Sequence, residues 1–314
     1  MRWNLLLLVA ANLGLAACSS TAEDPGAAVE AGKVDWQRDF DAALADADRT
    51  GKPVFLLFQE VPGCSGCKQF GRDVLGDDRL VRLIESEFIP VLIRNNVEGK
   101  EGKIRDRYQE PAWNYQVVRF LDARGGDLIP RKDRVWTTEE LAPRMIAALE
   151  KSNRPVPESL SLLAAGNPPA EATFATGCFW SGEEKLGRIP GVLTTEVGYI
   201  GDHEVVHLQY DASRLSVVDL IQAARAADCA DLIWLPSSDR RAGTQRLDPS
   251  DFHRAPASDQ KRMLHGSPLE KINLTPEQST QVNAWLRKDS QKALDFLTFA
   301  QRRYLERIQP SPHP

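Results

Sequence analysis

Residues 58–68 read Phe58-Gln59-Glu60-Val61-Pro62-Gly63-Cys64-Ser65-Gly66-Cys67-Lys68, and this stretch decides the fold of the first half of the chain. The apolar run before it, from Val54, predicts a buried strand, and residues 68–75 predict a helix. Cys64 would then lie at the positive end of a helix dipole, which lowers the pKa of its thiol and favours the attacking thiolate. Cys67 follows one turn later and can close a disulfide with Cys64, so the pair can exchange two electrons.

Two other interpretations of this pair are open. A Cys-x-x-Cys pair can be half of a zinc site, but no second Cys pair or His cluster follows at the usual spacing. A purely structural disulfide would gain little entropic stabilisation from so short a loop. We therefore expect thiol–disulfide exchange, with no bound metal and no cofactor.

The segments around the pair alternate between predicted helices and strands. Helical spacing begins at Trp36, Asp77-Asp78 can cap a second helix, strands are predicted at residues 88–93 and 117–121, and a further helix follows the cap Thr137. This order, over about residues 34–151, resembles the thioredoxin superfamily and implies a central sheet covered by helices. The resemblance also implies that Pro111 is the family's cis-proline, which packs against the Cys pair and helps to admit a substrate backbone.

The residues before the first Cys depart from the usual thioredoxin pattern. The common aromatic residue is absent, and Val61-Pro62-Gly63 stands in its place. This resembles a subgroup of bacterial thioredoxin-like proteins in which the first Cys position, here Cys64, is sometimes selenocysteine. The substitution would tune nucleophilicity at that position.

A second cysteine again lies where a predicted strand becomes a helix. Residues 172–175 predict the strand, and a helix follows Cys178. The same dipole argument favours a thiolate at Cys178. Four signals accompany it in order, namely Gly177-Cys178-Phe179-Trp180 with Glu183, Pro190-Gly191-Val192, Gly198-Tyr199, and a strand that ends in Tyr210-Asp211.

These signals resemble the peptide-methionine sulfoxide reductase A family over about residues 172–230. The resemblance implies that Cys178 attacks the sulfoxide sulfur and that Glu204 protonates the departing oxygen. It places Phe179 and Trp180 in a hydrophobic wall that receives the substrate methyl group, and we assign Tyr199 to the same substrate-binding set. Core packing of the aromatic pair and a solvated Glu204 remain alternatives.

The second segment also departs from its family. The family's long loop between Gly201 and Glu204, which brings a substrate-orienting tyrosine, is missing, and Cys229 replaces the Asp of the family's His-Asp-Pro. Cys229 could condense with a sulfenic acid on Cys178, expel water and form a disulfide. It could equally be a small buried residue.

The N-terminus predicts export. Arg2 precedes an apolar run, Leu5 to Leu15, that is short for a membrane span, and Ala16-Ala17-Cys18 ends it. This resembles the lipobox of bacterial lipoproteins and implies that Cys18 is acylated and anchors the mature chain to a membrane. Ser19 favours the outer membrane, facing the periplasm. An ordinary signal peptide that is cleaved nearby is the alternative.

Length and composition fit a globular protein of two domains. The chain has 314 residues, 42% apolar and 26% charged, and its net charge of −5 excludes an extended nucleic-acid surface. We predict α/β and α+β architecture with these segments: a signal peptide at residues 1–17, a tether at 18–33, a thioredoxin-like domain at 34–151, a linker at 152–170, a reductase-like domain at 171–230, and a loop and helical tail at 231–314.

The expected function is a redox relay on sulfur. Substrate would oxidise Cys178, Cys229 would resolve it, and Cys64 would attack the resulting disulfide and pair with Cys67. The substrate would be an oxidised methionine or a disulfide, either free or protein-bound, and an external thiol donor would reduce the oxidised cysteines again. This makes the protein an oxidoreductase, either peptide-methionine (S)-S-oxide reductase-like or a disulfide reductase.

Two alternatives to the relay stay open. In the first, the second domain has lost sulfoxide reduction and binds a partner or substrate for a thiol–disulfide oxidoreductase. In the second, Cys64 and Cys67 belong to a metal chaperone, although Met and suitably placed His residues are scarce.

Overall fold

The first half of the chain builds a three-stranded sheet around its most apolar strand. The computed structural model describes residues 28–113, 116–236, 241 and 243–309. In this sheet β1 (Val54–Gln59) lies at the centre, parallel to β2 (Ile89–Arg94) and antiparallel to β3 (Val117–Leu121). All six residues of β1 are buried, because helices cover both faces of the sheet.

The two faces of β1 belong to two hydrophobic clusters. Val54, Leu56 and Phe58 pack with α1 (Phe40–Thr50), whereas Phe55 and Leu57 face the other cluster. That other cluster contains residues of the helices α2 (Ser65–Asp73), α3 (Asp78–Glu87), α5 (Thr138–Lys151) and α6 (Glu158–Ala164). The alternation of side chains along a strand thus divides the core into two layers.

Helix caps fall at two positions that the sequence predicts. The side chain of Asp77 accepts a hydrogen bond from the backbone N–H of Arg79 and begins α3. The side chain of Thr137 accepts from the N–H of Glu140 and begins α5. The strongly charged α4 (Lys100–Arg107) was not predicted, and α6 lies within the segment that we expected to be a linker.

The second half builds a six-stranded sheet in the order β8-β7-β4-β6-β5-β9. At its centre β4 (Ala170–Ala175) pairs with β6 (His203–Tyr210), which forms a hairpin with β5 (Val192–Ile200). Only residues 201–202 join β5 to β6, and Gly201 has φ 56°, a left-handed conformation that glycine adopts readily. One face of the sheet packs against α7 (Phe179–Gly187) and α8 (Val217–Ala226).

The part of the chain after residue 230 differs from the expected loop and helices. It adds the strands β7 (Ile233–Leu235), β8 (Gln245–Arg246) and β9 (His253–Arg254) to the second sheet. The helices α9 (Pro276–Leu286), α10 (Ser290–Asp295) and α11 (Phe299–Ile308) follow, and α9 contacts α7 and β5. Short strands of two residues carry no periodicity of their own, so the sequence pattern could not indicate them.

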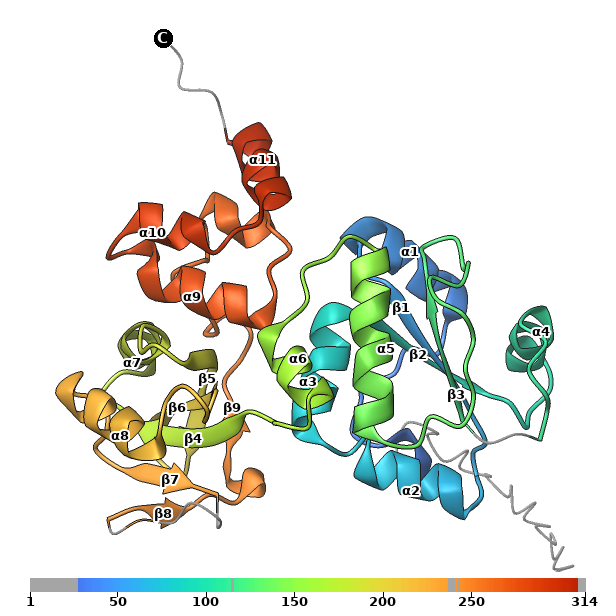
Figure 1. Cartoon of the computed structure of the whole chain (residues 1–314), viewed down its shortest axis with the longest axis horizontal. Helices are drawn as coiled ribbons and strands as arrows, with labels where there is room; N and C mark the ends of the chain where they lie inside the picture. Colours follow the sequence, from blue (N-terminus) through green and yellow to red (C-terminus); the bar gives the residue numbers. More distant parts are fainter. Residues whose placement is uncertain (1–27, 114–115, 237–240, 242, 310–314) are drawn as a thin grey trace, which may run out of the picture.

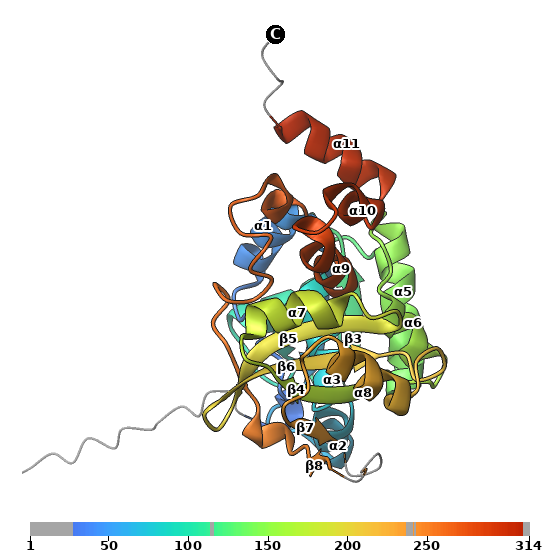
Figure 2. The same ribbon diagram turned by 90° about the vertical axis from the view of Figure 1, so that its left-hand side faces the viewer.

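In Figure 1, α3 lies on the side of the first unit that faces the second sheet, and polar side chains join the two units. Arg82 of α3 forms an ion pair of 2.9 Å with Glu171 of β4, and Arg154 Nη2 lies 3.4 Å from Asn273 Oδ1. Viewed from the side in Figure 2, α7 and α8 lie on the face of the second sheet that points away from the first unit. Within the described residues, no helix is both long and apolar enough to cross a membrane.

Candidate functional site

The first sulfur centre lies at the start of α2. Cys64 is the N-cap residue of this helix and is exposed, whereas Cys67 lies in its first turn and is fully buried. The two Sγ atoms are 3.5 Å apart. The strand β1 ends five residues before Cys64 and fixes the position from which the loop enters the helix, so both thiols are held at disulfide-forming distance.

The local environment gives the two thiols different acidities. The pKa of Cys64 is lowered, chiefly by the backbone N–H of Cys67 and further by the Cys67 thiol and the N–H of Gly66. Burial raises the pKa of Cys67 to about 12, and its hydrogen bond to Cys64 acts in the same direction. Cys64 is therefore suited to attack as a thiolate, while Cys67 keeps its proton until a mixed disulfide has formed.

Glu60 is the third polar group of this centre. Its carboxylate opposes the lowered pKa of Cys64, and its oxygen lies with the two sulfurs in a group whose ligand atoms are all within 4.8 Å of one another. In the described part of the chain this is the one group of three side chains with such spacing. Two thiolates and a carboxylate suit Zn²⁺, so the reduced pair could hold such an ion.

The prediction for Pro111 is wrong. Among the described residues the cis peptide bond is Val61-Pro62, two residues before Cys64, and the bond from Glu110 to Pro111 is trans. The buried Glu110 carboxylate accepts ion pairs from Arg119 and Arg131, at 2.7 Å each, which fix the backbone before Pro111. Position in the sequence could not indicate a cis bond, because such bonds are a small minority even before proline.

The second sulfur centre lies at the start of α7. Cys178 is the N-cap residue of this helix and is exposed to solvent. The strand β4 ends three residues earlier, and its neighbour β6 brings Glu204 to the same end of the sheet. The backbone N–H of Phe179 donates a hydrogen bond of 2.8 Å to Oε2 of Glu204, so the carboxylate lies beside the residue next to the cysteine.

Three aromatic side chains surround this point. The ring of Phe179 is buried and lies 5.7 Å from the ring of Trp180 and 5.5 Å from that of Tyr199, measured between centroids. Tyr199 is paired with Glu204 in the β5–β6 hairpin. The structure therefore brings the predicted residues Cys178, Phe179, Trp180, Tyr199 and Glu204 together in one place, with Cys178 open to solvent.

Cys229 lies near this centre but is not joined to Cys178. Its side chain is 1% exposed and its thiol donates to the carbonyl oxygen of Ala227 at 3.3 Å. Burial raises the pKa of Cys229. Its segment lies beside the end of β4, since the N–H of Asp231 bonds the carbonyl of Ala175 at 3.3 Å. Both cysteines are free in the structure.

The C-terminal part of the chain fixes α7 from outside, which the sequence did not indicate. The carboxylate of Glu183 is 1% exposed and accepts from Lys261 Nζ at 2.7 Å and from the N–H of Lys261 at 3.0 Å. Asn283 and Thr195 also donate to this carboxylate. The region to which we assigned no function thus positions the helix that carries Cys178.

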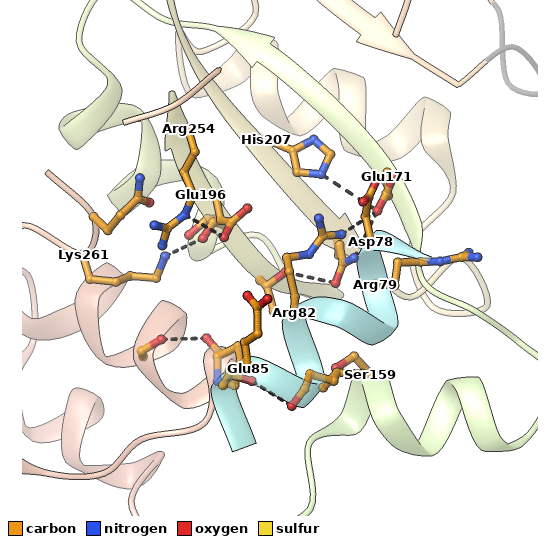
Figure 3. Close-up of a pocket in the computed structure, with 18 of the residues that line it drawn as sticks. Asp78, Arg79, Arg82, Glu85, Ser159, Glu171, Glu196, His207, Arg254 and Lys261 are labelled. Atoms are coloured by element: carbon orange, nitrogen blue, oxygen red, sulfur yellow. Dashed lines mark hydrogen bonds and ion pairs between the residues drawn. The ribbon is translucent and has the colours of Figure 1, made fainter. Parts of the chain in front are cut away.

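One cavity of the described structure lies away from both sulfur centres. It has a volume of about 720 Å³ and lies between α3 and the open face of the second sheet. Figure 3 shows the side chains of Arg82, Glu171 and His207 together at its wall. Its charged groups are largely paired with one another, as in the ion pairs Arg82–Glu171 and Arg254–Glu196. This cavity therefore belongs to the contact between the two units.

Two family models match the chain. One described as thioredoxin-like matches residues 35–123, and one described as peptide methionine sulfoxide reductase matches residues 170–212. The first match contains Cys64 and Cys67, and the second contains Cys178 and Glu204. The first match covers all three strands of the first sheet, and the second covers the strands β4, β5 and β6 of the second sheet.

Individual relatives agree with the second match. The chain is 37% identical over 70 residues to the peptide methionine sulfoxide reductase MsrA of Salinispora tropica, covering 17% of this chain and 32% of that protein. It is 29% identical over 121 residues to MsrA of Methanococcus maripaludis, covering 32% of this chain and 71% of that protein. It is 37% identical over 78 residues to the peptide methionine sulfoxide reductase of Drosophila melanogaster, covering 21% of this chain and 28% of that protein.

The fold and the comparisons agree on the order of the two units. A sheet with a Cys-x-x-Cys pair at the start of a helix precedes a sheet with an exposed cysteine at the start of another helix. The chain is a thioredoxin-like domain followed by a peptide methionine sulfoxide reductase (MsrA) domain.

Proposed function

We propose that the protein reduces methionine sulfoxide at Cys178 and draws the electrons from Cys64 and Cys67. The observation that carries the proposal is the group formed by the exposed Cys178, the carboxylate of Glu204 and the aromatic rings of Phe179 and Trp180. A nucleophile, a proton source and an apolar surface for a methyl group are the parts that attack on a sulfoxide sulfur requires.

The first step transfers oxygen from the substrate to the protein. The Cys178 thiol attacks the sulfoxide sulfur, Glu204 supplies a proton to the sulfoxide oxygen, and the products are the thioether and a sulfenic acid on Cys178. The substrate sulfur is reduced and the cysteine sulfur is oxidised by the same two electrons. Condensation of the sulfenic acid with the Cys229 thiol then forms a disulfide and releases water.

Cys229 must move for this second step. Its thiol is buried and bonded to Ala227, and no disulfide joins it to Cys178 in the described structure. Backbone hydrogen bonds join Ala175 to Asp231 and Leu232, so the segment of Cys229 lies beside the end of β4, three residues before Cys178. Formation of the disulfide would take Cys229 out of the hydrophobic core, at the expense of its apolar packing and of one weak hydrogen bond.

The Cys64 thiolate would then attack the disulfide of the second domain. Exchange returns both thiols there and leaves a Cys64–Cys67 disulfide, which an external dithiol reduces. The helices α2 and α7 lie apart in both views of the structure (Figures 1 and 2). The exchange therefore needs a reorientation of the two domains, for which a polar interface is favourable. Because both centres are on one chain, their effective concentration is high.

A second function is favoured by the short hairpin at the substrate site. Residues 201–202 alone join β5 to β6, so no longer loop from this hairpin encloses a substrate at Cys178. With Cys229 also buried, the second domain could bind a partner or substrate for a thiol–disulfide oxidoreductase without reducing sulfoxides.

The proposal includes a location in the bacterial cell envelope through a lipid on Cys18. Cys18 lies outside the described residues, and the motif Leu15-Ala16-Ala17-Cys18 supports the proposal. Labelling of growing cells with an alkyne fatty acid should mark the wild type and not the Cys18→Ser variant. If neither protein is labelled, the proposed lipid anchor on Cys18 is wrong.

One assay separates the two functions. Turnover of methionine sulfoxide with dithiothreitol and reduction of a test disulfide are measured for the wild type and for Cys178→Ser. The proposed function predicts sulfoxide turnover that Cys178→Ser abolishes, with disulfide reduction retained. Disulfide reduction without sulfoxide turnover in the wild type would select the second function.

A further inference from the structure

Arg262 lies over the face of Trp180, close to the sulfoxide-reductase site. Its guanidinium carbon is 5.4 Å from the centre of the indole ring, and its side chain is exposed. Among the described residues it has neither an ion-pair nor a hydrogen-bond partner. Arg262 is 50 residues beyond the last position matched by the reductase family model, residue 212, so it is contributed by the C-terminal part of this chain.

The neighbours of Arg262 hold it in place. Lys261 is fixed to the buried carboxylate of Glu183 through both its N–H and its Nζ. On the other side, the N–H of Met263 donates to Oδ1 of Asn283 at 2.9 Å. The backbone is thus tied to α7 and α9 immediately before and after Arg262, which limits the positions its side chain can reach.

The indole beneath Arg262 has an unsatisfied donor. Nε1 of Trp180 is buried and has no hydrogen-bond partner within the described structure. The guanidinium of Arg262 and the indole N–H of Trp180, neither with an acceptor among the described residues, therefore lie close together. Trp180 follows the exposed Cys178 by two residues. A guanidinium favours an anionic, planar acceptor that it can bind with two parallel hydrogen bonds.

We propose that Arg262 forms a subsite for a carboxylate of the sulfoxide substrate. This rests on the proposed function, because it assigns the substrate class for that same site. In methionine sulfoxide three carbons separate the sulfur from the α-carboxylate, so a free amino acid or a C-terminal residue would offer the carboxylate close to the reacting sulfur. An acidic side chain next to methionine sulfoxide in a peptide would offer the same group from a different origin.

Kinetics with three substrates test the subsite. N-acetylmethionine sulfoxide carries the α-carboxylate, its N-methylamide is neutral, and the amide of acetyl-methionine sulfoxide-aspartate carries only a side-chain carboxylate. We expect Arg262→Gln to lower kcat/KM about tenfold for the first substrate, mainly through KM, and to leave the neutral substrate unchanged. Arg262→Lys should recover part of the loss.

The aspartate peptide separates the two origins of the carboxylate. A loss of kcat/KM for this peptide alone would assign the subsite to acidic neighbours of the substrate, and a loss for N-acetylmethionine sulfoxide alone would assign it to the α-carboxylate. Arg287→Gln is the matched control, since Arg287 is also exposed near α7 but faces Glu184, with Nη1 and Oε1 3.6 Å apart. Arg287→Gln should leave kcat/KM unchanged for all three substrates.

A second measurement does not need catalysis. Alkylation of Cys178 by iodoacetate, which is an anion, and by neutral iodoacetamide is followed by peptide mapping. At Cys178, the iodoacetate rate divided by the iodoacetamide rate should fall about threefold or more in Arg262→Gln, because a positive charge is lost. The same ratio at Cys64 on the same chain should stay constant.

These results distinguish failure of the subsite from failure of the proposed function. Sulfoxide turnover with no change in either the substrate preference or the alkylation ratio would overturn the subsite and leave the function intact. No turnover of any substrate, with a lowered iodoacetate ratio in Arg262→Gln, would overturn the function and keep an anion site beside Cys178. An unchanged ratio without turnover would overturn both.

Discussion

The backbone N–H of Phe179 and the carboxylate of Glu204 are joined by a hydrogen bond of 2.8 Å. This bond ties the first residue of α7 to the strand β6 and uses one oxygen of the carboxylate. Within the described part of the chain, the other oxygen accepts no hydrogen bond. The position of the Glu204 carboxylate, our proposed proton source, is thus set by the main chain of the residue next to Cys178.

Glu204→Gln should lower kcat for methionine sulfoxide by about a hundredfold with little change in KM. A glutamine can still accept from the Phe179 N–H, so the helix start is kept while the acidic proton is lost. The check is steady-state kinetics with dithiothreitol. Glu196→Gln is the control: Glu196 lies on the neighbouring strand β5 and pairs with Arg254 on the other face of the sheet. Equal losses in both variants would contradict an acid role for Glu204.

The two thiols of α2 should differ in their reaction with pH. Because the pKa of Cys64 is lowered, its alkylation by iodoacetamide should rise through a midpoint below that of a cysteine in a denatured control. Cys67, with its pKa raised to about 12, should stay unreactive up to at least pH 9. Mass spectrometry of the two alkylated sites at a series of pH values gives both curves. A Cys64 midpoint equal to that of the denatured chain would contradict the assigned roles.

His207 should make the protein less stable in acid. It is buried at the contact between the domains, and this burial lowers its pKa below the usual value of about 6.5. The charge of Arg82 also lowers the pKa, whereas Glu171 and Glu196 raise it. The unfolded chain then binds the proton more readily. The stability that neutral His207 gives is complete above about pH 6.5 and is lost as pH falls through the folded pKa.

Urea denaturation at pH 7.5 and pH 5.5 measures this effect. The free energy of unfolding should fall between these values in the wild type, and the fall should be smaller in His207→Gln. His203→Gln is the control, because His203 is exposed at the end of the same strand. A pH dependence that is the same in the wild type and in both variants would show that His207 makes no such contribution.

The ion pair between Arg82 and Glu171 should slow the exchange between the two sulfur centres. It links α3 to β4 across the domain contact and is only partly exposed. Arg82→Gln should speed reduction of the oxidised Cys178 centre by Cys64 about two- to fivefold, as expected for the loss of one such pair. Arg49→Gln is the matched control, because Arg49 forms an ion pair of 2.8 Å with Asp46 within α1 of the first unit.

Stopped-flow measurement at several protein concentrations checks the route of exchange. A rate that is independent of concentration and rises only in Arg82→Gln fits exchange within one chain. A rate proportional to concentration would instead show that Cys64 reacts with Cys178 of another molecule, and would contradict a reorientation of domains.

Much of the first unit could be predicted because its signals are local. The apolar run that starts at Val54 gave β1, the strand at residues 117–121 has the predicted bounds, and the caps Asp77 and Thr137 begin their helices as expected. Each depends on side chains within a few residues of one another. The spacing of Cys64 and Cys67 is local too: residues three apart at the start of a helix lie on the same face, so their proximity could be predicted.

What could not be predicted depends on distant partners. The strands β8 and β9 exist because β7 and β5 are there to pair with them. Lys261 binds Glu183, which is 78 residues away in the sequence. The ion pairs of Glu110 with Arg119 and Arg131 fix the backbone before Pro111, and no local sequence pattern indicates them. Such contacts are set by the tertiary fold, which overrides local propensity.

The stoichiometry of a reaction without external reductant tests the central claim most directly. The fully reduced protein is mixed with excess methionine sulfoxide, and the methionine formed per chain is counted. The relay predicts about two methionines per chain for the wild type, about one for the Cys64→Ser/Cys67→Ser variant and none for Cys178→Ser, because each dithiol supplies one pair of electrons. About one methionine from the wild type would contradict the connection between the two centres, and none would contradict sulfoxide reduction at Cys178.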